Sequence, residues 1–226
     1  MNKALKLNSI EQFPLLSVLR REDKQQLCEY MTYRKVPRYS KIYQAGEASE
    51  HIFFLIKGTV KIAKSSEDKK EVIKTLIHPF TIFGEKGLVG EQYRSDFAQT
   101  LKGEVQLFAV KVEDFRRLMF RNFELTNQVM SLFGDRLIKA ENKLEALVCK
   151  DARTRIIEFI KNAITERGQR IGYEMLLKHS LTHQDIANIT YTSRQTVTLV
   201  LNELKKNNLI YFNRGRILVR DIAKLA

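Results

Sequence analysis

The chain has 226 residues, of which 44% are hydrophobic and 29% are charged, with 39 lysines and arginines against 26 aspartates and glutamates. This length is enough for two modest domains with cores of their own, and no apolar run approaches the roughly 18 residues that a membrane-spanning helix needs. The two cysteines, Cys28 and Cys149, are too few for a disulfide framework or a cysteine metal cluster.

Positive charge is densest in the C-terminal third of the chain. The 76 residues after Lys150 hold 13 basic and 7 acidic side chains, a surplus of 6, whereas the 150 residues up to it hold 26 and 19, a surplus of 7. Because a dense basic surface attracts polyanions, we expect nucleic acid to bind to the C-terminal third. Residues 1–11 carry no apolar signal core, so we expect a cytoplasmic protein with no membrane partner.

The N-terminal half is predicted to contain short helices followed by an all-β domain. Residues 9–31 have the apolar spacing of short helices, interrupted by Pro14. Short apolar runs then alternate with turn-forming or charged stretches every 8 to 12 residues or so, which is typical of a β-barrel or sandwich. The predicted strands lie within 36–43, 52–56, 60–62, 72–77, 82–83, 97–101 and 105–110, with a charged turn at 65–70 and a short helix over 112–120.

One loop of the predicted β domain combines glycines with groups that suit a phosphate-bearing ligand. Residues 83–90 are glycine-rich and follow a strand, and Arg94-Ser95 comes shortly after them. Glycines let backbone N–H groups approach a ligand, and a guanidinium beside a hydroxyl can hold a phosphate. Glu85 cannot favour a phosphate, so it would instead accept a hydrogen bond from a hydroxyl such as that of a ribose. The alternative is an ordinary glycine-rich hairpin with a surface arginine.

A long amphipathic helix is predicted from Asn122, its expected N-cap, to Lys150. Alternate steps of three and four residues trace a narrow apolar seam along it for nearly four heptads. At about 1.5 Å per residue the helix would be about 39 Å long, more than one small domain needs. We therefore predict a dimerisation helix rather than a helix that covers only its own domain. The interface residues are expected to be Phe123, Met130, Phe133, Leu137, Ala140, Leu144 and Leu147.

The residues after the long helix are predicted to fold as a winged helix-turn-helix. A helix over 152–167 leads into a loop at Gly168. Two short helices then follow within 182–204, separated by three or four residues, as in a helix-turn-helix. Residues 211–219 are expected to form the wing, a hairpin that turns near Gly215.

Side-chain oxygens are available to cap both helices of this motif. Thr182 can cap the first helix and form a capping box with Asp185, and Ser193 or Thr192 can cap the second. Ala187 is small and stands where the two helices approach each other.

The second helix carries polar side chains at the end that would enter the major groove. Arginine and glutamine suit the edges of guanine and adenine, and the other polar residues are placed to meet phosphates. The predicted DNA-binding residues are Thr182, Gln184, Ser193, Arg194, Gln195, Thr196, Thr198, Lys205, Arg214 and Arg216. A small helical domain that packs this way without binding DNA is the alternative.

These segments resemble the catabolite-activator (CRP/FNR) family of regulators and occur in the family's order over roughly residues 15–219. The likeness rests on the order of the strands, on Gly46-Glu47, on 54–58, on the glycine-rich loop with Arg94-Ser95, and on 192–197. In members that bind cyclic nucleotides, the matching residues hold the ribose and the cyclic phosphate. The resemblance therefore implies effector-binding roles for Gly84, Glu85, Arg94 and Ser95.

The chain departs from the family pattern at several positions. Members that sense cyclic AMP place a Thr-Ser pair on the long helix against the adenine, and a gapless comparison puts Ala140-Glu141 at those positions. The Pro-Gly pair that usually precedes the glycine-rich loop is replaced by Pro79-Phe80 in this chain. Well-known members have glutamate at the position of Gln195 and arginine at the position of Leu199. Because those two residues read the family's common half-site, we expect this chain to prefer a different operator sequence. Tyr191 stands where the turn usually has a glycine with positive φ, which implies strain of about 1–2 kcal/mol.

The resemblance also bears on cofactors. Iron–sulfur members need a cluster of cysteines near the N-terminus, and a haem would need histidine or cysteine in the loop, where this chain has neither. No metal, haem or iron–sulfur cluster is therefore expected. The effector is unknown, and a cyclic nucleotide or another anion is the candidate.

The sequence thus predicts an α+β protein with three parts. The first, over 1–121, is a double-stranded β-helix, that is, a jelly-roll sensor domain resembling cyclic-nucleotide-binding domains. A dimerisation helix over 122–150 and a winged helix-turn-helix over 151–226 follow it. We expect a bacterial homodimer that binds pseudo-palindromic double-stranded DNA, works with RNA polymerase, and binds its effector between the β-roll and the long helix. The alternative is a cyclic-nucleotide-binding protein that regulates a partner protein. No nucleophile–base pair, metal spacing or paired carboxylates indicates an enzyme.

Overall fold

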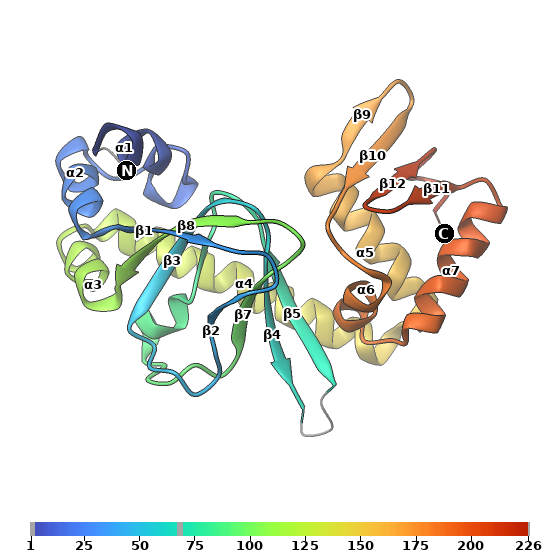
Figure 1. Ribbon diagram of the computed structural model, residues 1–226, viewed down its shortest axis with the longest axis horizontal. Helices are drawn as coiled ribbons and strands as arrows, with labels where there is room; N and C mark the ends of the chain where they lie inside the picture. The colour runs from blue at the N-terminus through green and yellow to red at the C-terminus, as the bar shows by residue number, and fades with distance from the viewer. Residues whose placement is uncertain (1–2, 67–69, 226) are drawn as a thin grey trace. The chain divides into compact units, whose positions relative to one another are not determined.

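The structure is a computed structural model that describes residues 3–66 and 70–225 (Figure 1). The chain divides into two compact units, one mainly up to Ile138 and one mainly from Lys139 onward. Residues 67–69 of the charged turn expected at 65–70 lie outside the described residues. Among the described helices, none is long and apolar enough to cross a membrane.

Most of the described helices and strands occur in the predicted order, but the stretch expected within 36–43 is interrupted at 37–40 and two strands within 169–178 were not predicted. Before the long helix come α1 (Lys3–Ile10), the 3-10 helix η1 (Pro14–Leu16), α2 (Arg21–Tyr30), β1 (Thr32–Val36), β2 (Lys41–Tyr43), β3 (His51–Lys57), β4 (Val60–Ser65), β5 (Glu71–Ile77), β6 (Ile82–Phe83), the 3-10 helix η2 (Glu85–Val89), β7 (Phe97–Thr100), β8 (Val105–Lys111) and α3 (Val112–Arg121). Then come α4 (Phe123–Cys149), α5 (Ala152–Arg167), β9 (Gln169–Ile171), β10 (Glu174–Lys178), α6 (His183–Thr190), α7 (Arg194–Lys206), β11 (Ile210–Asn213) and β12 (Arg216–Val219).

Two four-stranded sheets form the β-roll, with strand orders β1-β8-β3-β6 and β2-β7-β4-β5. The central strand β3 pairs with β8 in antiparallel register, which places Phe54 opposite Phe108. Side chains of β3 alternate between two cores, because Phe54 joins the cluster beneath the helices and Phe53 joins the cluster between the sheets. Burial on both faces explains why this strand is a continuous apolar run in the sequence.

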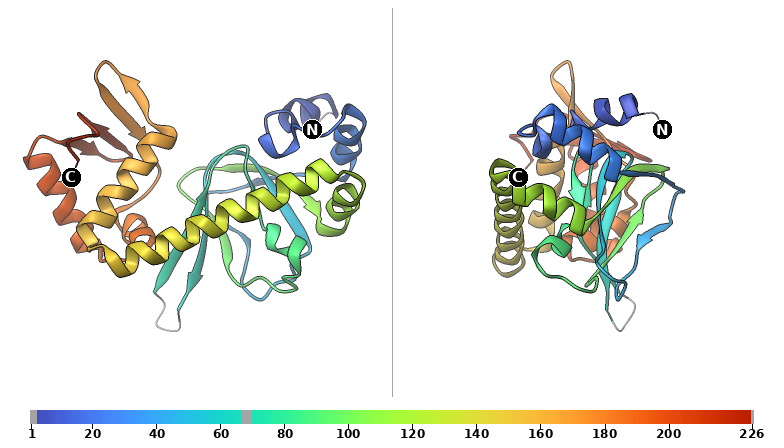
Figure 2. Two further views of the ribbon diagram at one scale, coloured as in Figure 1. Left: turned by 180° about the vertical axis from the view of Figure 1, so that it is seen from behind. Right: turned by 90° about the vertical axis from the view of Figure 1, so that its left-hand side faces the viewer.

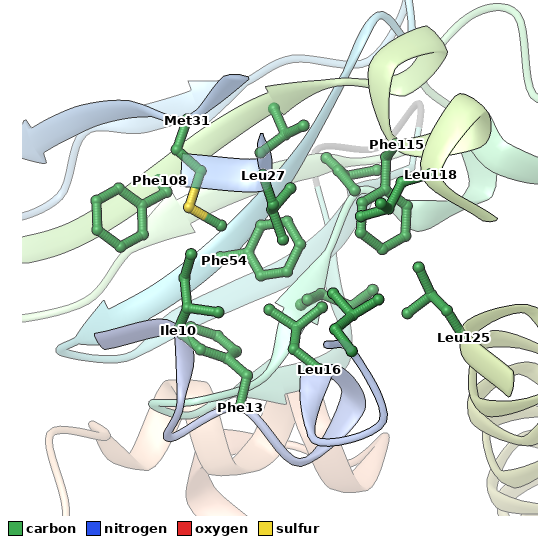
Figure 3. Packing of buried hydrophobic residues seen from close by; sticks show 14 of the residues in the cluster. Ile10, Phe13, Leu16, Leu27, Met31, Phe54, Phe108, Phe115, Leu118 and Leu125 are labelled. Carbon is green, nitrogen blue, oxygen red and sulfur yellow. The ribbon is translucent and has the colours of Figure 1, made fainter. Parts of the chain in front are cut away.

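The N-terminal helices and α3 cover one face of the first sheet (Figure 3). Phe13 packs edge-to-face on Phe54 with ring centroids 5.4 Å apart, and both side chains are fully buried. Leu118 of α3 and Leu125 at the start of α4 belong to the same core. Truncating a side chain such as Phe54 to alanine in a core of this kind costs about 3–5 kcal/mol.

The long helix α4 is continuous over its 27 residues (Figure 2). Asn122 caps it as predicted, since its Oδ1 accepts a hydrogen bond from the backbone N–H of Leu125 at 2.9 Å. Leu125 and Val129 are buried on the face that packs on the β-roll.

The C-terminal unit combines α5, α6 and α7 with a sheet of order β11-β12-β10-β9. Its core includes Ile160 of α5, Leu201 of α7 and Val219 of β12. The expected loop after Gly168 is wrong, because β9 and β10 form a hairpin there that extends the sheet of the wing. All three residues of β9 are exposed, so the alternation of apolar and polar residues that marks a strand is missing from its sequence.

Candidate nucleic-acid interface and effector site

The helix-turn-helix is built on the predicted caps. The Thr182 hydroxyl accepts from the Asp185 N–H at 3.1 Å, and the Asp185 carboxylate accepts from the Thr182 N–H at 2.8 Å, which makes a capping box. Ser193 Oγ accepts from the Thr196 N–H at 3.0 Å and caps α7. Tyr191 adopts the left-handed conformation expected of it, with φ 54° and ψ 50°.

Arg155 of α5 fixes the turn between these two helices, a role that sequence reasoning missed. Its guanidinium donates to the carbonyl oxygens of Thr190 at 3.0 Å, of Tyr191 at 3.2 Å and of Lys150 at 2.6 Å. The last carbonyl groups of a helix have no backbone N–H partner within the helix. Arg155 supplies hydrogen bonds to such carbonyl groups at the ends of two helices.

The outer face of α7 carries the residues that could reach DNA bases. Arg194 and Gln195 are exposed at its N-terminal end, while Val197, Val200, Leu201 and Leu204 are buried beneath them. Leu199 is 70% exposed, and Asn202 is exposed one turn further on. The sequence prediction of DNA-binding residues left out Leu199 and Asn202, although their spacing from Gln195 places them on the same face of the helix.

Several of the other predicted DNA-binding groups already have partners within the motif. Thr198 Oγ1 donates to the Arg194 carbonyl and also bonds Nδ1 of His183, each at 2.9 Å, so it joins α7 to α6. Gln184 Nε2 donates to Asn188 Oδ1 at 2.8 Å, and the hydroxyls of Ser193 and Thr196 are 2.8 Å apart. Burial, followed by the nearby charge of Arg194, lowers the pKa of His183.

The wing adds positive charge next to α7. Gly215 has φ +83° at the turn between β11 and β12, and Arg214 and Arg216 on either side of it are exposed. Lys205 of α7 lies over the rings of Tyr211 and Phe212, with its Nζ 5.4 and 5.6 Å from the two centroids. These contacts hold the wing and the end of α7 together without neutralising the lysine.

Most of the predicted apolar seam of α4 is uncovered in the single chain. Exposed fractions along the seam are Phe123 76%, Met130 66%, Leu137 61%, Leu144 65% and Leu147 38%, and Ala140 is exposed as well. Phe133 differs, because it is half-buried against the core beneath the N-terminal helices. Ile138 and Val148, which the prediction left out, are 55% and 79% exposed.

In the glycine-rich loop, the structure brings Gly84 and Arg94 into direct contact. Gly84 is left-handed with φ +74°, and its carbonyl accepts from Arg94 Nη1 at 2.8 Å; a Cβ at this position would lie 3.0 Å from the same nitrogen. Nη2 of Arg94 donates to the His51 carbonyl, and its guanidinium lies 4.4 Å from the centre of the Tyr43 ring. Arg94 is therefore a buried group, 3% exposed, rather than a surface arginine.

Glu85 faces the long helix. It is 3% exposed and forms an ion pair with Arg136 of α4, whose Nη2 also donates to the Ile82 carbonyl at 2.7 Å. Burial lowers the pKa of Arg136 to about 10. Sequence reasoning did not identify Arg136, and its only signal was a charged residue beside the apolar seam.

Two further carboxylates, those of Glu91 and Asp96, lie in this part of the β-roll. Glu91 Oε1 accepts from the Ser95 hydroxyl at 2.7 Å and from the Ser95 N–H at 3.2 Å. Asp96 is 2% exposed and accepts from Lys74 and Lys86, each at 2.8 Å. Burial by itself would raise the pKa of Asp96, but the hydrogen bonds from these two lysines outweigh it and hold the pKa below its usual value.

Tyr43 completes this group of residues. Its hydroxyl lies 3.3 Å from Asp96 Oδ1, and burial followed by the charge of Asp96 raises its pKa. The predicted pocket is thus a network of mutually compensating charges inside the β-roll.

Two family comparisons match the two parts of the chain. The family described as cyclic nucleotide-binding domain matches residues 33–122, and the family described as Crp-like helix-turn-helix domain matches residues 154–226. The matched segments contain the β-roll and the winged helix-turn-helix, and the whole of α4 lies between them in the sequence.

Individual proteins give the same result. The chain is 27% identical over 183 residues to a global nitrogen regulator of Synechococcus elongatus, covering 80% of this chain and 82% of that protein. It is 26% identical to the cyclic AMP receptor protein of Thermus thermophilus, covering 94% of each. A structure of a CooA mutant from Carboxydothermus hydrogenoformans shares the fold, with a TM-score of 0.75, 22% identity and 87% coverage of each chain. The chain belongs to the CRP/FNR family of DNA-binding transcription regulators, as its sequence predicted, and is not an enzyme.

Proposed function

We propose that this regulator acts as a homodimer on a pseudo-palindromic DNA site. The uncovered apolar seam of α4 is the observation that carries the proposal. Phe123, Met130, Leu137 and Leu144 recur every seven residues and are all more than 60% exposed. Exposed apolar side chains at this spacing are those that pack against a second helix in a coiled coil.

A two-fold dimer would present two copies of α7. Recognition helices related by two-fold symmetry read half-sites about 34 Å apart, one turn of DNA, and such an operator is a palindrome or nearly so. Arg194, Gln195 and Leu199 supply the base-facing chemistry, while Thr182, Gln184, Ser193, Thr196, Lys205, Arg214 and Arg216 supply the contacts to phosphates. Thr198 supports α7 from its inner side through His183.

The cell compartment and the other partners follow from this role. A bacterial regulator that binds the chromosome acts in the cytoplasm, and it must affect RNA polymerase to change transcription. The effector position is proposed at Gly84, Glu85, Arg94 and Ser95, next to α4. No observation favours the alternative of a protein that regulates a partner without DNA, and the exposure of Arg194 and Gln195 argues against it.

Selection of bound duplexes from a random pool tests the proposal. The full chain should enrich a motif with two inverted half-sites. The Arg194→Ala variant should lose about 5- to 150-fold of its preference for that motif, because a bidentate contact to a base contributes about 1–3 kcal/mol. It should keep salt-sensitive binding to any DNA, since the phosphate contacts remain.

Arg170→Ala is the matched control. It removes the same charge from the same unit, on β9 at the edge of the sheet farthest from β11, and should leave the motif and its affinity unchanged. A pool that shows no enrichment, or an Arg194→Ala variant that selects the same motif with the same affinity, would overturn the proposal.

A further inference from the structure

The carboxylate of Glu91 lies among hydrogen-bond donors that suit a phosphate. Its Oε1 accepts from the hydroxyl and the N–H of Ser95 at 2.7 and 3.2 Å, and its Oε2 accepts from the hydroxyl of Ser49 at 3.2 Å. Two cations are also close, with Arg94 Nη1 3.9 Å from Oε2 and Lys86 Nζ 3.8 Å from Oε1. Hydroxyl, backbone N–H and guanidinium groups are the donors with which proteins hold phosphate oxygens.

The backbone holds this carboxylate in place. Gly90 precedes Glu91 in the left-handed conformation with φ +104°, and the Glu91 N–H donates to the Lys86 carbonyl at 3.1 Å, closing the turn after η2. On the other side, the Ser49 N–H donates to the Gln92 carbonyl at 2.8 Å. The Glu91 side chain is 15% exposed, so its position is set by the protein more than by solvent.

The charges around this position are already compensated. Asp96 accepts hydrogen bonds from Lys74 and Lys86. Glu91 lies close to Arg94 and to the same lysine, Lys86. A bound phosphate would have to share these cations with two carboxylates, and like charges at such distances repel strongly in a partly buried site. The hydrogen bonds from the Ser95 hydroxyl and N–H to Glu91 would also have to break before these groups could bind the ligand.

We propose that Glu91 is an internal substitute for an anionic effector: its carboxylate occupies the anion position between Ser95, Ser49 and Arg94 and excludes phosphate-bearing ligands. The proposal deepens the function proposed above and rests on the effector position assigned there. Glu91 is thereby the specificity-determining residue of the sensor domain. The wild-type sensor domain keeps a single conformation without binding a cyclic nucleotide.

Arg94 also has one hydrogen-bond donor that Glu91 does not use. Among the described residues, Nε of Arg94 is buried without a hydrogen-bond partner. A glutamine at position 91 keeps the size of the side chain and removes the negative charge, so an incoming anion would meet Arg94, Lys86 and the Ser95 hydroxyl without a competing carboxylate.

Titration calorimetry on the full chain tests this inference, with cyclic AMP and inorganic phosphate as separate titrants. Wild-type protein should give no binding heat at high micromolar cyclic AMP. The Glu91→Gln variant should bind cyclic AMP at least about tenfold more tightly than wild type does. A gain for both titrants indicates an anion position as such, and a gain for cyclic AMP alone indicates a nucleotide pocket; both support the proposal.

The Glu104→Gln variant is the matched control, because it removes the same charge from an exposed turn of the same β-roll. It should behave as wild type. Ser95→Ala added to Glu91→Gln should remove the gain, which separates a site at Ser95 from a general effect of charge. If Glu91→Gln does not fold, Glu91→Ala takes its place, and the thermal unfolding midpoint of each variant identifies the folded ones.

Three results would overturn the inference: wild-type protein that binds cyclic AMP as tightly as Glu91→Gln, a folded Glu91→Gln variant that does not bind cyclic AMP, or an equal gain in Glu104→Gln. The measurement contains no DNA. A negative calorimetric result therefore does not contradict the DNA-binding proposal. Likewise, a failure to select a DNA motif does not affect the interpretation of the calorimetry.

Discussion

The guanidinium of Arg155 donates a hydrogen bond to the carbonyl oxygen of Tyr191 at 3.2 Å, at the single left-handed residue between α6 and α7. The same side chain holds the Thr190 carbonyl at 3.0 Å. Because the turn sets how α7 projects from the domain, this contact connects α5 to the presentation of the recognition helix.

The Arg155→Met variant should destabilise the helix-turn-helix locally by about 2–3 kcal/mol, since hydrogen bonds from a charged donor to buried carbonyls are lost. Amide hydrogen exchange of α6 and α7 in the full chain measures the local opening free energy. Arg153→Met on the same helix is the control, because its ion pair with Glu203 at 3.0 Å is exposed and contributes less than about 1 kcal/mol. Equal protection of α6 in both variants would contradict the assigned role.

Backbone strain at Tyr191 gives a second prediction. A side chain with a Cβ costs about 1–2 kcal/mol in the left-handed region, and β-branched residues tolerate it least. Tyr191→Val should therefore be less stable than Tyr191→Gly, by about 1–2 kcal/mol in urea unfolding. The same pair of substitutions at Thr192, which has no positive φ, should not favour glycine. A Val variant as stable as the Gly variant would show that the turn relaxes.

Asp96 makes the stability of the β-roll depend on acidic pH. Its pKa is lower in the folded chain, where the hydrogen bonds from Lys74 and Lys86 outweigh the effect of burial. Such a group contributes stability above its unfolded pKa, near 3.9, and that contribution is lost as the pH falls through the lower folded pKa. The difference in urea midpoint between wild type and Asp96→Asn should thus be large at pH 7 and shrink below pH 4. A difference that stays constant with pH would contradict this.

Leu199 should read a thymine methyl group. An apolar side chain that is 70% exposed on the base-facing side of α7 gains most by burial against such a methyl. Replacing each thymine of the selected operator by deoxyuridine should weaken wild-type binding about fourfold at one position per half-site, as burial of one carbon contributes about 0.8 kcal/mol. Leu199→Ala should be insensitive to that change, and the control Ile171→Ala should respond as wild type. Equal sensitivity in Leu199→Ala would exclude the contact.

The features that could be predicted from the sequence were those with a local signature. Thr182 and Ser193 cap α6 and α7 as their spacing indicates, and Tyr191 has the positive φ that the turn between two fixed helices requires. Most of the seam that was predicted along α4 is exposed as its spacing indicates, whereas Phe133 is half-buried and the exposed Ile138 and Val148 were not predicted. In each case the information lies within one or two helical turns of the residue concerned.

The features that were missed depend on partners distant in the sequence. Glu85 pairs with Arg136, 51 residues away, and no local pattern couples them. Asp96 and Glu91 act on the candidate effector site only because the β-roll folds Lys74, Lys86 and Ser49 around them. The β9–β10 hairpin was missed for another reason, because its first strand has no buried residue to reveal it.

Sedimentation equilibrium of the full chain with a duplex bearing the selected operator tests the central claim, that α4 joins two chains so that two copies of α7 meet one DNA site. The predicted result is two chains per duplex, and a dimer of the free protein at micromolar concentration, which Leu137→Glu should dissociate by placing a charge in the apolar seam. One chain per duplex, with the free protein a monomer, would contradict the account.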